Sequence, residues 1–325
     1  MNILLLTAHS IAEYDDLRMF TDIGYDVFSI GAYSNPHAPG DDKRPALPQA
    51  GYHKEFAALT ADQMASKENL PDAIIDWADA IVCHHYPERW IYGQWARIKH
   101  KRVIWRTCGQ SNPVLEDIMR DLRAQGLQIV RYSPKEAPFF RGIGHFAGQD
   151  AMIRFGKYPS DYPAWTGEGG YIANVTQNMA DRGQFCGFSF YLNATAGLDA
   201  RPAGPGSEAL PGGVGPLPVA DMYGYLSKAG AYLYTGTFPA SYTLGLIEAG
   251  LVGVPVVSIG PEAFGAPGLF EGHELSWAWS DKPESAREAI GHALASGKRA
   301  SVMQQGLFEG FRIVSVGQEW KEFLS

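Results

Sequence analysis

The sequence predicts an α/β protein made of two halves, each a parallel sheet covered by helices. The chain has 325 residues, which is enough for two domains of ordinary size. Two series of apolar runs alternate with helical patterns, one starting at Asn2 and the other at Tyr171. Pro134–Gly170, between the two series, is rich in glycine, proline and aromatic residues. We therefore place a domain boundary inside this stretch, near residue 150.

The first half opens with a strand, a helix and a second strand. Asn2–Ala8 is an apolar run typical of a buried parallel strand, and it leads into His9 and Ser10. Ile11–Ile23 has apolar residues near helical spacing and is followed by a glycine that ends the helix. Tyr25–Ile30 is the second predicted strand. This order of elements predicts a parallel sheet.

The rest of the first half contains a loop, three strands and a helix. Ser34–Gln49 carries prolines, glycines and four consecutive charged residues, which predict a surface loop. The strands are expected at Ala80–Cys83, Arg102–Trp105 and Leu127–Arg131, and the helix at Leu115–Gln125.

The second half repeats the alternation. Tyr171–Val175 and Cys186–Leu192 are predicted strands, and Gly197–Gly215 is a predicted mobile loop of low sequence complexity. Tyr232–Ser258 predicts a strand, a polar turn, a helix and another strand. Glu284–Ser296 and Val302–Leu324 are expected to be helical. A second parallel sheet is therefore expected.

Composition and cysteine usage limit the compartment and the partners. The formal net charge is −8, which does not favour nucleic acid as a partner, although a local basic groove would still allow it. Cys83, Cys108 and Cys186 are far apart and form no C-x-x-C pair, which fits a reducing compartment. The opening apolar run is too short for a signal peptide, and no apolar stretch is long enough to span a membrane. We therefore expect a cytoplasmic protein.

Glu248 is the most informative residue of the second half. It is the one acid in the apolar helix predicted within Tyr232–Ser258. In a parallel sheet, ligands bind at the carboxyl ends of the strands, where a helix that starts there directs free N–H groups at an anion. An acid in such a helix either occupies the exposed face of a half-buried helix or contacts a ligand.

The run Leu244–Val257, LGLIEAGLVGVPVV, resembles the nucleotide-sugar signature of retaining GT-B glycosyltransferases of the family 4-like (group 1) type. In that family a glutamate, seven residues and a second glutamate precede Ala, a small residue, Gly, any residue, Pro and two valines. The second glutamate binds the ribose hydroxyls of the donor, and Glu248 matches its position. Ala240 stands at the position of the first glutamate, so the chain departs from the family there.

The resemblance implies a fold and an activity. The fold would be GT-B, an α/β architecture of two Rossmann-like domains that face each other across a crevice. Residues 1–150 would form the N-terminal acceptor domain, 151–306 the C-terminal donor domain, and 307–325 a helix that packs back on the N-terminal domain. The activity would be hexosyl transfer from a nucleoside-diphosphate sugar, with a UDP-sugar favoured, to an acceptor hydroxyl with retention. No cofactor and no bound metal are expected.

The same resemblance implies a donor-binding set. Relatives carry an arginine, a spacer of four and a lysine after the first strand of the second domain, where this chain has Gln177 and Arg182. Arg182 suits a bidentate contact with a diphosphate, and a solvated charge after a strand is the alternative. The polar turn and the helix start would add hydroxyls and backbone N–H groups. The predicted donor-binding residues are Gln177, Arg182, Ser241, Tyr242, Thr243, Leu244 and Glu248.

Two adjacent histidines are the catalytic candidates. Asp79–Pro87 resembles the strand that in these transferases ends in a histidine beside the reacting sugar, and it contains His84 and His85. Adjacent residues at a strand end point to opposite sides, so at most one is expected to face the crevice, and His85 is favoured. It would orient the sugar or accept a proton. A structural role is the alternative for each.

Polar residues at other strand ends of the first half predict an acceptor pocket. Because the carboxyl ends of parallel strands meet at one edge, these side chains should converge there, although ordinary loop polarity would give the same pattern. The predicted acceptor-binding residues are His9, Ser10, Arg106, Gln110 and Ser111. The run Arg106–Ser111, together with residues 131–136 and 153–157, resembles a divergent sub-family of bacterial and phage-type glycosyltransferases.

Three other functions share parts of this pattern. A sugar-nucleotide 2-epimerase of GT-B fold would bind a UDP-sugar and isomerise it. A phage-type enzyme would glycosylate a hydroxymethyl-pyrimidine in DNA, although Lys99–Arg102 is the only dense basic run. A non-catalytic binding module would fit the uncharged residues at 177 and 240. Motifs of NAD-binding, P-loop, zinc-protease and serine-hydrolase sites are absent from the sequence. The acceptor and the oligomeric state do not follow from it.

Overall fold

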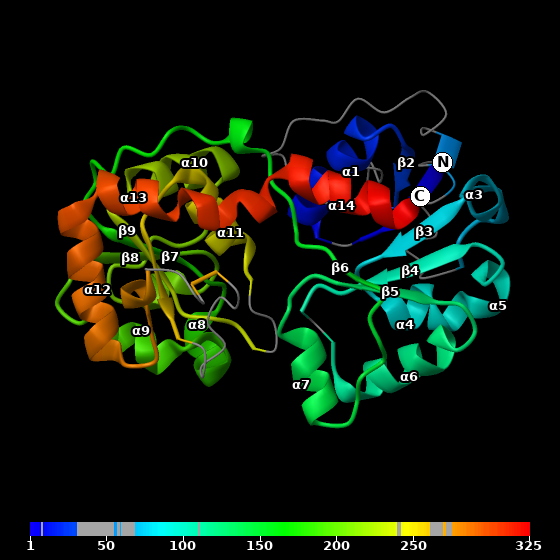
Figure 1. The fold of residues 1–325 in the computed structure, drawn as a ribbon, viewed down its shortest axis with the longest axis horizontal. Coiled ribbons are helices and arrows are strands. Elements are labelled where there is room, and N and C mark those ends of the chain that lie inside the picture. Colours follow the sequence, from blue (N-terminus) through cyan, green and yellow to red (C-terminus); the bar gives the residue numbers. More distant parts are fainter. Residues whose placement is uncertain are drawn as a thin grey trace. The chain divides into compact units, whose positions relative to one another are not determined.

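The computed structural model describes residues 1–7, 9–30, 55, 56, 59, 69–109, 111–238, 242–260, 269, 270 and 275–325. The predicted loop at 34–49 lies outside these residues. The chain divides into two compact units (Figure 1). The first comprises Met1–Tyr132, Glu136–Gly156 and Val316–Ser325, and the second comprises Ser133–Lys135 and Lys157–Ser315.

The first unit is built on a six-stranded sheet in which every pair of neighbours is parallel. Its strands are β1 (Asn2–Leu6), β2 (Asp26–Ser29), β3 (Ala80–Cys83), β4 (Arg102–Arg106), β5 (Gln128–Arg131) and β6 (Ala151–Met152). Their order is β2-β1-β3-β4-β5-β6. The chain therefore turns to the other side of β1 when it reaches β3. The switch point between β1 and β3 is where a ligand binds in an open sheet of this kind.

Helices cover both faces of this sheet. They are α1 (Ser10–Asp22), α3 (Asp72–Trp77), α4 (Pro87–Trp90), α5 (Trp95–Ile98), α6 (Pro113–Arg123) and α7 (Glu136–Gly142), together with η1 (Tyr92–Gln94). Alternate strand residues such as Leu4, Ile81 and Val103 join one core with residues of α3 to α6, as the two-residue period of a strand requires. On α6, the side chain of Asn112 accepts a hydrogen bond from the N–H of Leu115 and so caps the helix.

The end of the chain belongs to the first unit. Helix α14 (Ile313–Leu324) lies beside α1 (Figure 1), where the buried ring of Trp320 meets Phe20 edge-on with ring centroids 5.1 Å apart. Arg102 of β4 donates hydrogen bonds to the carbonyls of Phe323 and Leu324, at 2.5 and 2.7 Å. The last helix is thus fixed to the sheet by apolar packing and by its terminal carbonyls.

The second unit is built on a five-stranded parallel sheet of order β11-β10-β9-β7-β8. Its strands are β7 (Ile172–Val175), β8 (Ala200–Ala203), β9 (Ala231–Tyr234), β10 (Val256–Ile259) and β11 (Trp279–Ser280). The chain passes from β7 to β8 on one side and later to β9 on the other side of β7. The switch point of this sheet therefore lies between β7 and β9.

The helices of the second unit are α8 (Met179–Arg182), α9 (Phe188–Thr195), α10 (Val219–Lys228), α11 (Leu244–Val252), α12 (Pro283–Ser296) and α13 (Lys298–Gln304). Short 3-10 helices are η2 (Pro159–Asp161), η3 (Gly183–Cys186), η4 (Ser207–Ala209), η6 (Ser276–Ala278) and η7 (Gln305–Phe311). Ile172, Leu233 and Val257 of the central strands share a core with α9 and α12. The strand, helix and strand predicted within Tyr232–Ser258 are β9, α11 and β10.

The strand predicted at Cys186–Leu192 is wrong, because this segment ends η3 and begins α9. Its run of aromatic residues favours a strand locally. In the structure, Phe190 and Ala194 lie one helical turn apart and are buried together. Tertiary burial of one helix face has therefore overridden the local preference.

The stretch predicted as a loop at 197–215 contains a strand, β8, and the turn η4. Its glycines are required by close backbone packing. A Cβ on Gly213 would lie 1.7 Å from the carbonyl oxygen of Ser207, and Gly212 has φ +73° with the carbonyl oxygen of Ala200 beside it. The low complexity of the stretch therefore reflects tight packing around an edge strand.

Candidate functional site

The carboxyl edge of the second sheet places one predicted donor-binding residue, Arg182, close to its switch point. Arg182 follows β7 at the end of α8 and is exposed. Its Nη2 donates a hydrogen bond to Oγ1 of Thr237, which follows β9, at 2.9 Å. This hydrogen bond holds the guanidinium beside the end of β9. The rest of the group is exposed to solvent.

Helix α11 starts against the same edge. Thr243 caps it, since its Oγ1 accepts a hydrogen bond from the N–H of Leu246 at 3.2 Å, and Leu244 is its first residue. A Cβ on Gly245 would lie 2.7 Å from Cβ of Val175 and 3.0 Å from the hydroxyl of Tyr232. The first turn of α11 therefore lies against the carboxyl end of β7 and the hydroxyl of Tyr232 in β9.

Tyr242, just before the cap, is only 4% exposed and meets Phe311 edge-on with ring centroids 5.0 Å apart. Ser241, also predicted to bind the donor, lies outside the described residues, as does Ala240. Gln177 is exposed after β7 and precedes Asn178, which has the left-handed φ of 48°. Donor binding by these residues stays a prediction.

Glu248 lies on the second turn of α11 and is 6% exposed, so the exposed-face alternative is wrong. Its Oε1 lies 3.0 Å from Nζ of Lys157 and accepts a hydrogen bond from the hydroxyl of Tyr162 at 3.3 Å. The side chain of Lys157 is 1% exposed. Lys157 and Tyr162 were not predicted as site residues, although residues 153–157 were part of a run with a family resemblance.

In the first unit, His85 and His9 meet at the switch point between β1 and β3. Their rings are stacked with centroids 6.3 Å apart. Nδ1 of His85 lies 3.2 Å from Oγ1 of Thr7, and Nε2 lies 3.7 Å from Sγ of Cys108. Burial, with a smaller effect of His9, lowers the pKa of His85 to about 4. The His85 ring is therefore neutral at pH 7 and fixed on both nitrogens.

His9 also caps α1, because its Nδ1 accepts a hydrogen bond from the N–H of Ala12 at 3.4 Å. Ser10 is the first residue of that helix. The helix start, His9 and His85 thus form one polar group at the carboxyl edge of the first sheet.

His84 points into the protein. It is 2% exposed, and its Nε2 lies 3.2 Å from Oδ2 of Asp16. Burial lowers the pKa of His84 well below its ordinary value, and the positive charge of Arg106 adds to this effect. Of the two adjacent histidines, His85 is the one with partial exposure at the sheet edge.

Arg106 is also buried. Its guanidinium donates hydrogen bonds to the carbonyls of Ile153 and Arg154, at 2.9 and 3.0 Å, and lies 4.5 Å from the ring centroid of Phe155. These contacts join β4 to the segment that follows β6, which is a structural role that needs no acceptor. An acceptor role for Arg106 stays a prediction.

Ser111 donates a hydrogen bond to Oε1 of Glu116 at 2.7 Å, and Gln110 lies outside the described residues. Glu116 is itself fully buried and forms a bidentate pair with Arg131, with both N···O distances at 2.6 Å. This hydrogen bond joins Ser111 to the buried pair of Glu116 and Arg131.

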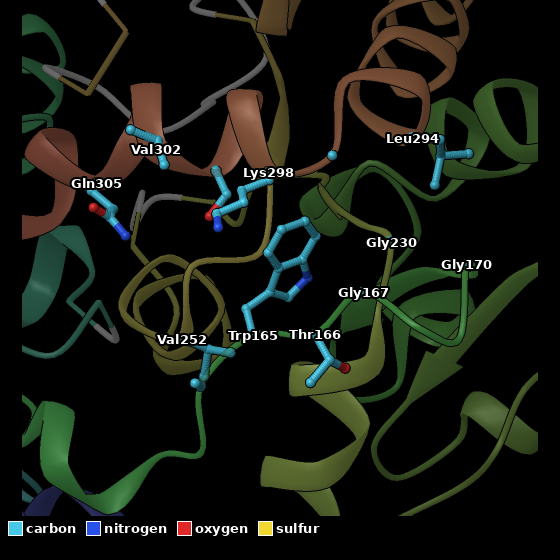
Figure 2. Close-up of a pocket in the computed structure, with 13 residues that line it drawn as sticks. Trp165, Thr166, Gly167, Gly170, Gly230, Val252, Leu294, Lys298, Val302 and Gln305 are labelled. Atoms are coloured by element: carbon cyan, nitrogen blue, oxygen red, sulfur yellow. The ribbon is translucent and has the colours of Figure 1, made fainter.

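A cavity of about 620 Å³ in the second unit lies away from these residues. Figure 2 shows its lining, in which Trp165 stands near Gly167 and Lys298, and the chain segments just before β7 and β9 contribute Gly170 and Gly230. The cavity is thus at the amino edge of the sheet. Because parallel sheets bind ligands at the carboxyl edge, the edge with Arg182 and the α11 start, rather than this cavity, remains the predicted donor site.

Among the described residues, no group of three or more His, Cys, Asp or Glu side chains is placed to hold a metal ion. None of the helices in the described part of the chain is long and apolar enough to cross a membrane.

Comparison with known proteins finds similarity of structure only, since no protein-family model and no curated protein sequence matches the chain. Sucrose-phosphate synthase from Thermosynechococcus elongatus has a TM-score of 0.68 at 12% identity, over 100% of this chain and 98% of that one. HepE from Anabaena, in complex with UDP-glucose, has a TM-score of 0.67 at 14% identity, over 100% and 99%. The lipopolysaccharide outer core galactosyltransferase WaaB has a TM-score of 0.53 at 14% identity, over 100% and 99%.

These similarities cover the whole chain and both sheets. The two parallel α/β units, each with its own switch point, match sucrose-phosphate synthase over 98% and HepE over 99% of those chains. The fold predicted from the sequence is confirmed, and the chain has the two-domain GT-B fold.

Proposed function

We propose that this chain transfers a sugar from a nucleoside-diphosphate sugar to an acceptor hydroxyl, with retention and without a metal ion. The observation that carries the proposal is the position of the signature-like run Leu244–Val257. It forms α11 and β10, and the first turn of α11 lies against the carboxyl end of β7, one of the two strands at the switch point. A UDP-sugar is the favoured donor, since HepE, which has the same fold, forms complexes with UDP and UDP-glucose.

The diphosphate would occupy the space between Arg182 and the first turn of α11. The free N–H groups of a helix start and a guanidinium both favour a phosphate anion. They would stabilise the charge that develops on the diphosphate as the sugar leaves. This arrangement supports transfer that needs no metal ion. The ribose hydroxyls would donate hydrogen bonds to Glu248.

In the proposed reaction, the bond between the anomeric carbon and the diphosphate oxygen breaks, and its electron pair leaves with UDP. The acceptor oxygen forms a new bond to that carbon on the same face, and its proton passes to the departing phosphate. His85, with a pKa of about 4, is a weak base at pH 7. We therefore propose that His85 does not take up this proton.

Isothermal titration calorimetry with UDP, GDP and ADP tests the proposal. We expect UDP to bind and Glu248→Ala to weaken its binding about tenfold or more, because a charge-assisted hydrogen bond is lost. Glu168→Ala, which removes an exposed acid of the same unit, is the control. EDTA should leave UDP binding unchanged. The proposal fails when none of the three nucleotides binds at millimolar concentration, or when Glu248→Ala binds UDP as tightly as the wild type does.

Assays with UDP-glucose and candidate acceptors then follow turnover. Release of UDP that depends on an acceptor is expected. Isomerisation of UDP-GlcNAc without an acceptor would instead identify a 2-epimerase.

A further inference from the structure

We infer that Lys157 and Tyr162 are positioning residues for the donor, which hold one oxygen of the Glu248 carboxylate so that the other receives the ribose hydroxyls. The inference rests on the proposed function and adds two residues to its site. Both lie in the segment that opens the main stretch of the second unit, just after Gly156.

Both polar contacts to the Glu248 carboxylate involve the same oxygen atom. Nζ of Lys157 and the hydroxyl of Tyr162 both approach Oε1, at 3.0 and 3.3 Å. Among the described residues, these are the hydrogen bond and the ion pair that the Glu248 carboxylate makes. A carboxylate offers about four acceptor positions on its two oxygens, so Oε2 retains its capacity to accept from a ligand.

The two positioning residues are themselves fixed. The N–H of Lys157 donates to the carbonyl of Phe311 at 2.9 Å, and the carbonyl of Lys157 accepts from Ile313 at 2.9 Å. The ring of Tyr162 meets Tyr223 edge-on with centroids 4.6 Å apart. The carboxylate therefore has two anchored partners, and its torsion angles are restricted before a ligand arrives.

Charge gives a second argument for Lys157. The resembled family has an arginine at the position of Gln177 and a glutamate at that of Ala240, so this chain lacks one charge of each sign there. A buried carboxylate beside a diphosphate would repel it. The ammonium of Lys157, 3.0 Å from the carboxylate, offsets the charge of Glu248. The carboxylate can then serve as a hydrogen-bond acceptor for hydroxyls without repelling the donor.

The experiment compares the dissociation constants of UDP and 2′,3′-dideoxyuridine diphosphate by calorimetry. The ratio of the two constants measures recognition of the ribose hydroxyls. In the wild type we expect UDP to bind more tightly by about tenfold or more. Lys157→Met, which keeps the volume and removes the charge, should reduce this ratio about tenfold. Tyr162→Phe should reduce it by about threefold, since one neutral hydrogen bond is lost.

Two controls accompany these variants. Lys228→Met removes an ammonium from an exposed pair with Glu168 in the same unit, where both side chains are more than half exposed, and it should leave the ratio unchanged. Lys157→Arg keeps the positive charge and should retain most of the wild-type ratio. A purely structural role of Lys157 would weaken both nucleotides equally.

The outcomes separate the inference from the proposed function. No binding of UDP to the wild type would defeat the proposed function. A wild type that prefers UDP, with the same preference in Lys157→Met, would overturn the inference and leave the function standing. Where Lys157→Met fails to fold by circular dichroism, Tyr162→Phe decides, because it removes a single hydroxyl. An unchanged ratio in that variant would equally overturn the inference.

Discussion

At the scale of single residues, the adjacent histidines His84 and His85 lie in two different environments. His84 is buried against Asp16 and Phe155, whereas His85 reaches the sheet edge between Thr7 and Cys108. Consecutive residues at the end of a strand point to opposite faces, so one ring enters the protein and the other lies at the edge. The resulting neutral His85 has a measurable effect on stability.

The pKa of His85 is about 4 in the folded protein and near 6.5 in an unfolded chain. The lowered pKa means that its contribution is complete above about pH 6.5 and is lost as the pH falls towards 4, because the unfolded chain binds the proton first. Between pH 7.5 and 4.5, the free energy of unfolding of the wild type should fall by on the order of 2–3 kcal/mol more than that of His85→Gln. Urea unfolding at both pH values measures this difference. The exposed His100→Gln should behave like the wild type, and equal losses in wild type and His85→Gln would contradict the prediction.

At the scale of elements, the placement of α11 depends on a glycine in its first turn. Gly245→Ala would bring a Cβ to 2.7 Å from Val175 at the end of β7, although alanine favours the helix itself. The clash should win, since overpacking costs about 1–3 kcal/mol. We expect lower stability in urea and weaker UDP binding, because the N–H groups of the first turn shift.

Gly291→Ala in α12 is the matched control for this variant. Nothing lies within 4 Å of its Cβ position, so the change should stabilise the protein by about 0.5–1 kcal/mol. Wild-type affinity and stability in Gly245→Ala would show that α11 does not depend on this close approach.

The elements also show which parts of the molecule a sequence can predict. β1, β3, β7, β9 and α11 follow from local apolar patterns and from glycine stops, and the resemblance of 244–257 identified the fold. The strand predicted at Cys186–Leu192 is wrong because the burial of α9 depends on distant partners in α12. Tyr162 contacts Glu248 across 86 positions of sequence, and no local pattern marks such a partner. The sequence therefore predicts the strands and helices that carry the candidate site better than it predicts the side-chain contacts within the site.

At the scale of the whole molecule, the first unit is discontinuous in sequence, since it includes Val316–Ser325. The chain leaves this unit at Gly156 and contributes to it again only at its end. The stability of the N-terminal sheet should therefore depend on the last helix. Trp320 is the residue on which this dependence centres, because it is fully buried against Phe20 and its ring centroid lies 5.3 Å from the Arg106 guanidinium carbon.

We expect Trp320→Ala to lower the free energy of unfolding of the first unit by about 3–5 kcal/mol, the usual cost of truncating a buried aromatic residue. Val314→Ala changes a residue of the same helix that is 80% exposed, and it should stay within about 0.5 kcal/mol of the wild type. Urea unfolding followed by circular dichroism measures the free energy of unfolding of both variants. UDP binding is measured separately and indicates whether the second unit is folded. Because two units need not unfold together, the transition that Trp320→Ala shifts identifies the unit that the helix stabilises. A shift confined to the transition at which UDP binding is lost would show that the last helix stabilises the second unit instead.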